Sequence, residues 1–334
     1  MNQGNMLRYI GVGFVVLLSL SPLYSQEKLA QTGFNFLSVG SIGRASAMGE
    51  TFTTVEGVSS ALFYNPAGLA RMNHLLDVAV SWNSWIADIT HNSLSLAVAP
   101  RQGHYGVVGF SFLWVDYGEF LGTMVWNNSR GFIDTENFSP RAMAIGLGYG
   151  KSLTDKFSVG GQMKYVTQSA GRSVTPDINS PSGLGVAKSV LSVIAFDFGT
   201  IYQTGFKSLA FGMSVRNFSE EIKFEQEGFQ LPLTFRIGLA MNLMDFWEQY
   251  SQTHALLLAV DAVHPRSHGE YLSLGLEYTL LKLFALRAGY ISNQDEFQFT
   301  YGLGIHKFGL SVDYAYMPAG VFDDVQRITI SFSR

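Results

Sequence analysis

From about residue 75 onward, apolar and polar side chains alternate along the chain with a period of two. In the segment YLSLGLEYTL (271–280), four leucines and one tyrosine fall on one face, whereas tyrosine, serine, glycine, glutamate and threonine fall on the other. Segments 297–306, 308–316 and 157–165 show the same pattern. Successive side chains of a β-strand point to opposite faces, so the pattern predicts strands with one apolar face and one small or polar face.

Fourteen such segments can be counted along the chain. Most are about nine to twelve residues long, which suits a tilted strand that crosses a bilayer. They start near residues 75, 91, 104, 141, 157, 189, 207, 233, 254, 270, 283, 297, 308 and 326.

Two architectures bury apolar strand faces: a soluble β-sandwich and a membrane β-barrel. The outer face of a sandwich is rich in Lys and Glu, whereas the polar faces here carry mostly Gly, Ser, Ala and Thr. Tryptophans and tyrosines gather near the strand ends, as in an interfacial girdle. The pattern therefore predicts an all-β fold, a 14-stranded antiparallel transmembrane barrel. Single charges on the polar faces are predicted to lie in the lumen, where opposite charges can pair: Asp77, Lys164, Asp197, Arg216, Arg236, Asp261, Glu277, Arg287 and Asp313.

The connections between the predicted strands also fit a barrel. Short gaps and long gaps tend to alternate, as they do when short turns lie at one end and long loops at the other. The long gaps are 116–140, 170–188 and 218–232. Gap 244–253 is long but falls on the short-turn side. It indicates either a brief periplasmic helix or a slip in the strand count.

The sequence divides into three parts. Residues 1–25 resemble a signal peptide, because an apolar run of about twelve residues is too short to span a bilayer. Residues 26–74 do not alternate and are rich in small residues. They carry several aromatic residues and little charge, which favours an inward-folded hatch over a disordered leader. Residues 75–334 form the predicted outer-membrane barrel.

The segment ALFYNPAGLA (61–70) interrupts the hatch. Pro66 ends regular structure because it fixes φ and lacks an N–H, and Gly68 then permits a turn. Asn65 is expected to cap this turn with its side chain. The candidate hatch motif is therefore Asn65, Pro66, Ala67 and Gly68.

Several segments carry a family resemblance. They are GRASAMGETFTTVEGVSSALFYNPAGLARM (43–72), VSWNSWIADITHNSLSLAVAP (80–100), VDYGEF (115–120), LTDKFSVGGQMKYV (153–166), AFDFGTIYQTGFKSLAFGMSVRNF (195–218) and GLSVDYAYMPAG (309–320). They resemble the PorV/PorQ family of outer-membrane proteins, which is related to FadL-type transporters of hydrophobic compounds. The resemblance implies a FadL/PorV-like barrel with an N-terminal lumenal hatch in the cell outer membrane, and places Asn65, Pro66 and Ala67 on a hatch motif of FadL-like proteins. It also implies an association with type IX secretion, in which PorV binds and shuttles secreted cargo.

Three functions remain open at this stage: a secretion-associated barrel that binds cargo and secretion-system components, a FadL-like channel for small hydrophobic compounds, and a structural barrel. Exposed apolar residues on the outer loops would favour protein binding. An apolar pocket between loops and hatch would favour transport. Loop 116–140 offers four candidate binding residues: Phe120, Leu121, Trp126 and Phe132.

Enzymatic and metal chemistry find no support in the sequence. The seven histidines fall in no recognisable nucleophile or HExxH pattern. His264 and His268 would suit zinc on a helix, but Pro265 and Gly269 indicate a loop. No cofactor is predicted. With a net charge of −4, nucleic acid is not expected as a partner, whereas membrane lipid is.

Overall fold

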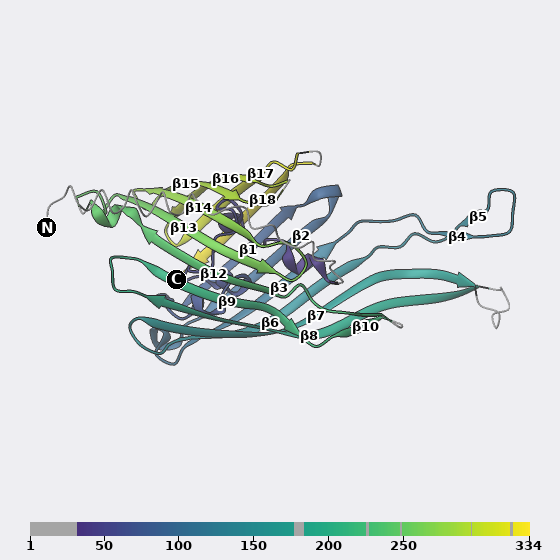
Figure 1. The fold of residues 1–334 in the computed structure, drawn as a ribbon, viewed down its shortest axis with the longest axis horizontal. Coiled ribbons are helices and arrows are strands. Elements are labelled where there is room, and N and C mark those ends of the chain that lie inside the picture. The colour runs from purple at the N-terminus through teal and green to yellow at the C-terminus, as the bar shows by residue number, and fades with distance from the viewer. Residues whose placement is uncertain (1–31, 177–183, 225–226, 248, 295, 321–322) are drawn as a thin grey trace.

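The computed structural model describes residues 32–334 except 177–183, 225–226, 248, 295 and 321–322. The predicted signal peptide lies outside the described residues. Fourteen antiparallel strands form a closed barrel, in which chain neighbours pair and β1 pairs with β18 (Figure 1). The predicted fourteen-strand fold is confirmed. The wall strands are β1 (Leu76–Ser84), β2 (Thr90–Val98), β3 (Val107–Asp116), β6 (Arg141–Ser152), β7 (Phe157–Pro176), β8 (Leu184–Gln203), β9 (Ala210–Ser219), β12 (Thr234–Asn242), β13 (His254–Pro265), β14 (Tyr271–Leu280), β15 (Phe284–Ile291), β16 (Phe299–Lys307), β17 (Leu310–Met317) and β18 (Val325–Ser333).

The two ends of the barrel differ in their connections. We call the end with the short connections 153–156, 281–283 and 308–309 the turn end, and the opposite end the loop end. The long gap 244–253 belongs to the turn end and begins with the 3-10 helix η6 (Leu243–Phe246), so the strand count does not slip there. The turn end also carries the 3-10 helix η5 (Pro100–Gly103).

Two ribbons extend from the loop end beyond the barrel wall, toward the right of Figure 1. One is the hairpin of β4 (Thr123–Val125) and β5 (Phe132–Asp134). The other is the upper part of β7 and β8, because β6 pairs with β7 only as far as Ser169 whereas β7–β8 pairing continues to Pro176. The loop end also holds the 3-10 helix η4 (Ile86–Asp88) and the hairpin of β10 (Ile222–Phe224) and β11 (Glu227–Phe229).

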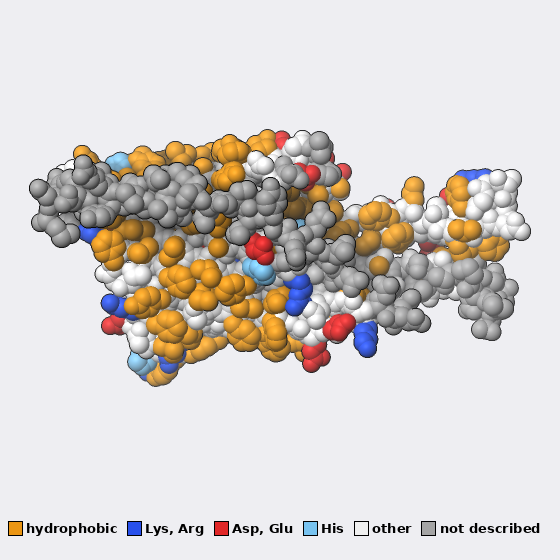
Figure 2. Space-filling view, in the orientation of Figure 1, with side chains coloured by type: hydrophobic (Ala, Val, Ile, Leu, Met, Phe, Trp, Pro, Cys, Tyr) orange, Lys and Arg blue, Asp and Glu red, His pale blue; other side chains and the backbone are white. Residues whose placement is uncertain are grey.

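Outward faces of the wall are apolar, and inward faces are small or polar. Leu274 and Leu303, for example, expose 43% and 56% of their surface. Figure 2 shows hydrophobic side chains spread over the barrel wall in this view. Within the described residues, no helix is long and apolar enough to span a bilayer.

The N-terminal segment, residues 32–74, folds against the inner wall of the barrel (purple in Figure 1), and we call it the hatch. It contains four short helices: η1 (Asn35–Ser38), α2 (Gly43–Ser46), η2 (Ser59–Phe63) and η3 (Pro66–Leu69). Helix α2 contacts β16–β18, whereas η3 contacts β6–β8. Glycines on the inner wall allow this approach, since a Cβ at Gly160 would collide with the backbone of Pro66.

Candidate functional site

The Asn-Pro-Ala-Gly segment joins three parts of the molecule. Asn65 is fully buried and its Oδ1 accepts a hydrogen bond from Ala67 N at 3.1 Å, which caps η3. Its Nδ2 donates to the carbonyl of Thr53 in the hatch (2.7 Å) and to that of Thr200 on β8 (3.2 Å). A Cβ at Gly199 would overlap the Asn65 side chain. The motif thus fixes the hatch chain to itself and to the wall.

The charges predicted for the lumen lie on inward faces, and most of them pair. Lys164 Nζ lies 2.7 Å from Asp197 Oδ2. Arg287 donates to Glu277 (2.5 Å) and to Asp313 (2.7 Å). These five side chains are more than nine-tenths buried, so each carboxylate would be costly without its cation.

The remaining predicted charges mainly contact the hatch. Asp77 accepts a hydrogen bond from Ser59 N (2.7 Å), and Asp261 accepts one from the Thr53 hydroxyl (2.6 Å). Arg236 Nη1 donates to the Glu50 carbonyl (2.8 Å) and lies 3.9 Å from Asp261. Arg216 is partly exposed; it reaches the Leu37 carbonyl (3.4 Å) and lies over the Tyr64 ring.

Sequence reasoning missed the charges that the hatch itself contributes. Arg44 forms two hydrogen bonds to Glu277, at 2.7 and 2.9 Å. Glu50 accepts from the Tyr64 hydroxyl (2.7 Å) and from Arg327 on β18 (3.3 Å). Arg327 could have been found, because it falls on the same face of the last strand as Thr329. Arg44 and Glu50 lie in a segment without periodicity, so no sequence signal marked them.

Two acid–base groups of the hatch are perturbed by burial. Burial, reinforced by the neighbouring Glu50 carboxylate, raises the pKa of Tyr64 above its ordinary range, so the phenol is a hydrogen-bond donor. Burial also raises the pKa of Glu56, although Arg71 at 3.1 Å and a hydrogen bond from Gln203 oppose that shift.

Two cavities lie on opposite sides of the hatch. The first, about 630 Å³, lies at the loop end, and we call it the vestibule; its lining includes Asn35, Glu50, Trp85, Arg236, His268 and Phe297. Trp85 and Phe297 stack at 5.1 Å between two loops at the vestibule. The second cavity, about 120 Å³, reaches toward the turn end and is lined by Arg44, Phe52, Asp77, His306, Asp313 and Ser333. Glu50 lines the first cavity and Arg44 the second, so the hatch separates them.

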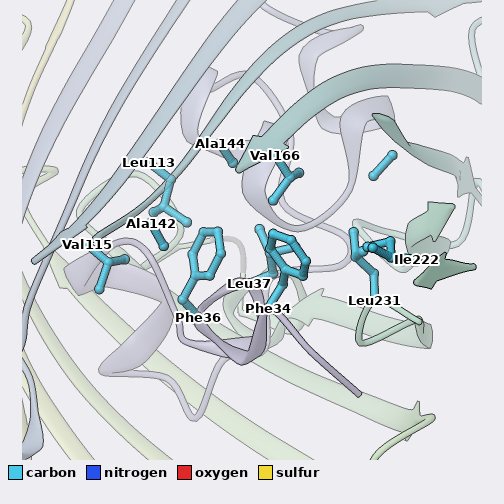
Figure 3. Packing of buried hydrophobic residues seen from close by; sticks show 11 residues of the cluster. Phe34, Phe36, Leu37, Leu113, Val115, Ala142, Ala144, Val166, Ile222 and Leu231 are labelled. Atoms are coloured by element: carbon cyan, nitrogen blue, oxygen red, sulfur yellow. The ribbon is translucent and has the colours of Figure 1, made fainter. Parts of the chain in front are cut away.

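An apolar cluster, which we call the cup, occupies the lumen on the β3–β8 side. Phe34, Phe36 and Leu37 of the hatch are buried there against the wall and the β10–β11 hairpin (Figure 3). The wall and hairpin contribute eight apolar residues to the cup: Leu113, Val115, Ala142, Ala144, Val166, Ala195, Ile222 and Leu231. Its small wall residues leave room for the two rings.

The four candidate loop residues lie on or beside the β4–β5 hairpin, outside the barrel. Their exposed fractions are 47% for Phe120, 81% for Leu121, 42% for Trp126 and 37% for Phe132. Phe120 stacks on Phe138 at 5.6 Å and forms a β-bridge with it. The structure therefore places these residues together, but apart from the vestibule and the cup.

Fold and lumen together define a class of protein: a closed fourteen-strand barrel whose N-terminal segment fills the lumen. The chain belongs to the uncharacterised protein family UPF0164, whose profile matches residues 19–317. No significant match to a curated protein was found.

Among solved structures, the fold is similar to the toluene transporter TbuX of Ralstonia pickettii, with a TM-score of 0.61 and 14% identity over 90% of this chain and 100% of that one. The monoaromatic hydrocarbon channel CymD gives 0.60 and 14%, over 90% and 99%. A FadL homologue of Pseudomonas aeruginosa gives 0.51 and 11%, over 88% and 98%. The FadL-like part of the expected resemblance is thus supported at the level of the fold, whereas the PorV/PorQ assignment is not.

Proposed function

We propose that this chain is a non-enzymatic outer-membrane channel that admits small hydrophobic molecules, with the hatch as its gate. The observation that carries this proposal is the lumen itself, in which an apolar cup lies beside the hatch and a vestibule opens at the loop end. Apolar outward faces on the wall strands support a membrane location. Solved proteins of similar fold are described as transporters and channels of toluene and monoaromatic hydrocarbons, which supports this class of solute.

The vestibule suits the first contact with such a solute. Trp85 and Phe297 offer a pair of stacked rings at the loop end. Phe34, Phe36 and Leu37 occupy the cup, so a solute must displace them or pass beside them. Passage from the vestibule to the turn end requires the hatch to move, because the hatch lies between the two cavities.

The experiment that tests this proposal measures uptake of labelled toluene, at low concentration, by cells that express the chain in an outer membrane lacking its own hydrophobic channels. The chain contains no cysteine, which makes an engineered disulfide unambiguous. The hydroxyl oxygens of Ser59 in the hatch and Ser95 on β2 lie 2.8 Å apart, so Ser59→Cys/Ser95→Cys should cross-link hatch and wall.

Uptake is expected to fall when this pair is oxidised and to recover when it is reduced. Ser59→Cys alone is the matched control and should respond to neither treatment. Wild-type uptake no faster than that of cells without the chain would contradict the transport function. Equal uptake by the oxidised and reduced pair would contradict gating by this part of the hatch.

A second candidate function is the binding of a protein partner, such as secreted cargo carrying a type IX C-terminal signal or a secretion-system component. The observation that favours it is the exposure of Leu121 and Val125, at 81% and 86%, on a hairpin that stands beyond the barrel wall. Recovery of cargo with the wild-type chain, and its loss with Leu121→Ser/Val125→Ser, would support it. If no cargo is recovered and toluene is taken up, the results would contradict partner binding and favour the channel function.

A further inference from the structure

The outer surface of the barrel carries a groove next to the loop-end rim. It runs over β3, β6 and β7 and has a volume of about 440 Å³. Phe112, Trp114 and Met143 line it from the outward face, since their neighbours Leu113 and Ala144 are buried in the lumen. This side of the wall faces the bilayer in the membrane location proposed above, so the groove is open to lipid rather than to water.

The groove changes from apolar to polar toward the rim. Arg141 and Ser169 line its polar end, and they share the last rung of the β6–β7 ladder. A second cavity of about 490 Å³ continues from the same two residues and adds Arg172 and Glu136. Lipid molecules have this same order, with an acyl chain in the membrane and a charged headgroup at its surface.

Among the described residues, the two arginines have unused hydrogen-bonding capacity. Within the described part of the chain, neither Arg141 nor Arg172 forms an ion pair or side-chain hydrogen bond, and both are exposed. Guanidinium groups bind phosphate through paired N–H donors. Together with Glu136, the two arginines leave one net positive charge, which suits a phosphodiester with a single negative charge.

We propose that this groove is a binding site for an anionic phospholipid, with one acyl chain between Trp114 and Met143 and the headgroup phosphate between Arg141 and Arg172. The site rests on the membrane location in the proposed function, and it is independent of what passes through the lumen. It lies outside the barrel, separate from the vestibule and the hatch.

The test measures which lipids remain on the purified barrel. The wild-type chain is incubated in detergent with equal amounts of phosphatidylglycerol and phosphatidylcholine of the same acyl chains, and retained lipids are counted by native mass spectrometry. We expect about tenfold preference for phosphatidylglycerol, a ratio that corresponds to about 1.4 kcal/mol. Arg141→Gln/Arg172→Gln should remove the preference, and Met143→Trp, which fills the groove, should reduce retention of both lipids.

Arg130→Gln is the matched control, since Arg130 lies at the hairpin tip away from the groove and should leave retention unchanged. Migration on unheated gels checks that each variant keeps the folded barrel. Equal retention of the two lipids by the wild type, or unchanged preference in the double variant, would overturn the site. Displacement of the retained lipid by an equal concentration of glycerol phosphate would also overturn the site, because the acyl chain of the lipid would then contribute nothing to binding. Toluene uptake is measured separately, so its absence contradicts the channel and not the lipid site.

Discussion

The hatch is held in two different ways on the two sides of the lumen. On the β14–β18 side, ion pairs hold the hatch: Arg44 of the hatch pairs with Glu277, and Glu50 of the hatch pairs with Arg327. Glu277 also pairs with Arg287 of the wall. On the β3–β8 side, the side chains of Phe34, Phe36 and Leu37 are held by apolar packing in the cup. Two hydrogen bonds add to this: the Phe36 carbonyl is bonded to His91, and the Leu37 carbonyl accepts from Arg216. Buried charges demand particular partners, whereas an apolar group can be exchanged for another of similar size.

This difference suggests that the two sides of the lumen have different roles. The charged side fixes the position of the hatch, because a displaced cation would leave a buried carboxylate unpaired. The apolar side can yield to an apolar solute, since the solute would restore the lost contacts. In the proposed channel, a solute would therefore loosen the hatch first at residues 34–37, where no ion pair is broken among the described residues.

The largest effect is expected on the charged side. Arg287→Met should lower the free energy of unfolding by about 3–5 kcal/mol, because it leaves the buried carboxylate of Asp313 without its arginine and leaves Glu277 with Arg44 alone. Urea unfolding in detergent micelles measures this change. Arg130→Met removes an exposed pair of 3.7 Å and should cost less than about 1 kcal/mol. Equal costs for the two variants would mean that the buried network stabilises the barrel no more than an exposed ion pair does.

The next effect is expected in the cup. Phe36→Ala should cost about 3 kcal/mol, because a buried ring is lost and a cavity is left. Unlike the charged variant, this one should regain part of the loss when toluene is added, since a ligand that binds the folded state stabilises it. Phe308→Ala, at a 90% exposed position, is the control and should show neither effect. Equal responses of Phe36→Ala and Arg287→Met to toluene would remove the proposed contrast.

A smaller effect is expected where Asn65 joins the hatch to β8. Asn65→Ala should cost about 1–2 kcal/mol through loss of the η3 cap and of the donor to Thr53 and Thr200. Hydrogen exchange at residues 53–70 locates the effect. Asn73→Ala, an exposed hatch position, should leave exchange there unchanged. If the η3 amides of Asn65→Ala exchange as slowly as those of the wild type, packing alone fixes the motif.

Much of the barrel could be predicted from the sequence because period-two alternation reports directly which side chains face in. All fourteen wall strands lie near their predicted positions, although β3 starts at Val107 instead of near 104 and β9 at Ala210 instead of near 207. The largest departure is β8, which starts at Leu184 instead of near 189, and the predicted gap 170–188 is shorter because β7 continues to Pro176. The inward charges followed from the same alternation, as Glu277 and Arg287 illustrate. Their partners did not: Arg44 and Glu50 lie 233 and 277 residues from Glu277 and Arg327, and only the folded hatch brings them together.

The cup was also beyond sequence reasoning. Phe34 and Phe36 were visible as aromatic residues of a hatch, but Ala142, Ala144 and Ala195 gave no sign that they would form its wall. A small residue on the wall indicates a binding cup only when the side chains that pack against it are known. The same holds for the outer groove, where Arg141 and Arg172 are 31 positions apart in the sequence and line one cavity because β6 pairs with β7.

The smallest expected effect is a pH dependence at the turn end of the hatch. Burial raises the pKa of Glu56 above its ordinary value of 4.5, so the folded chain binds a proton there more readily than the unfolded chain. The contribution of Glu56 to stability is therefore greatest below pH 4.5 and falls as the pH rises through the raised pKa. Unfolding free energies from pH 4 to 7 should show a smaller decline in Glu56→Gln than in the wild type. Glu220→Gln, at an exposed loop position, should keep the wild-type slope. Identical slopes in all three chains would mean that Arg71 and Gln203 compensate the burial of Glu56 completely.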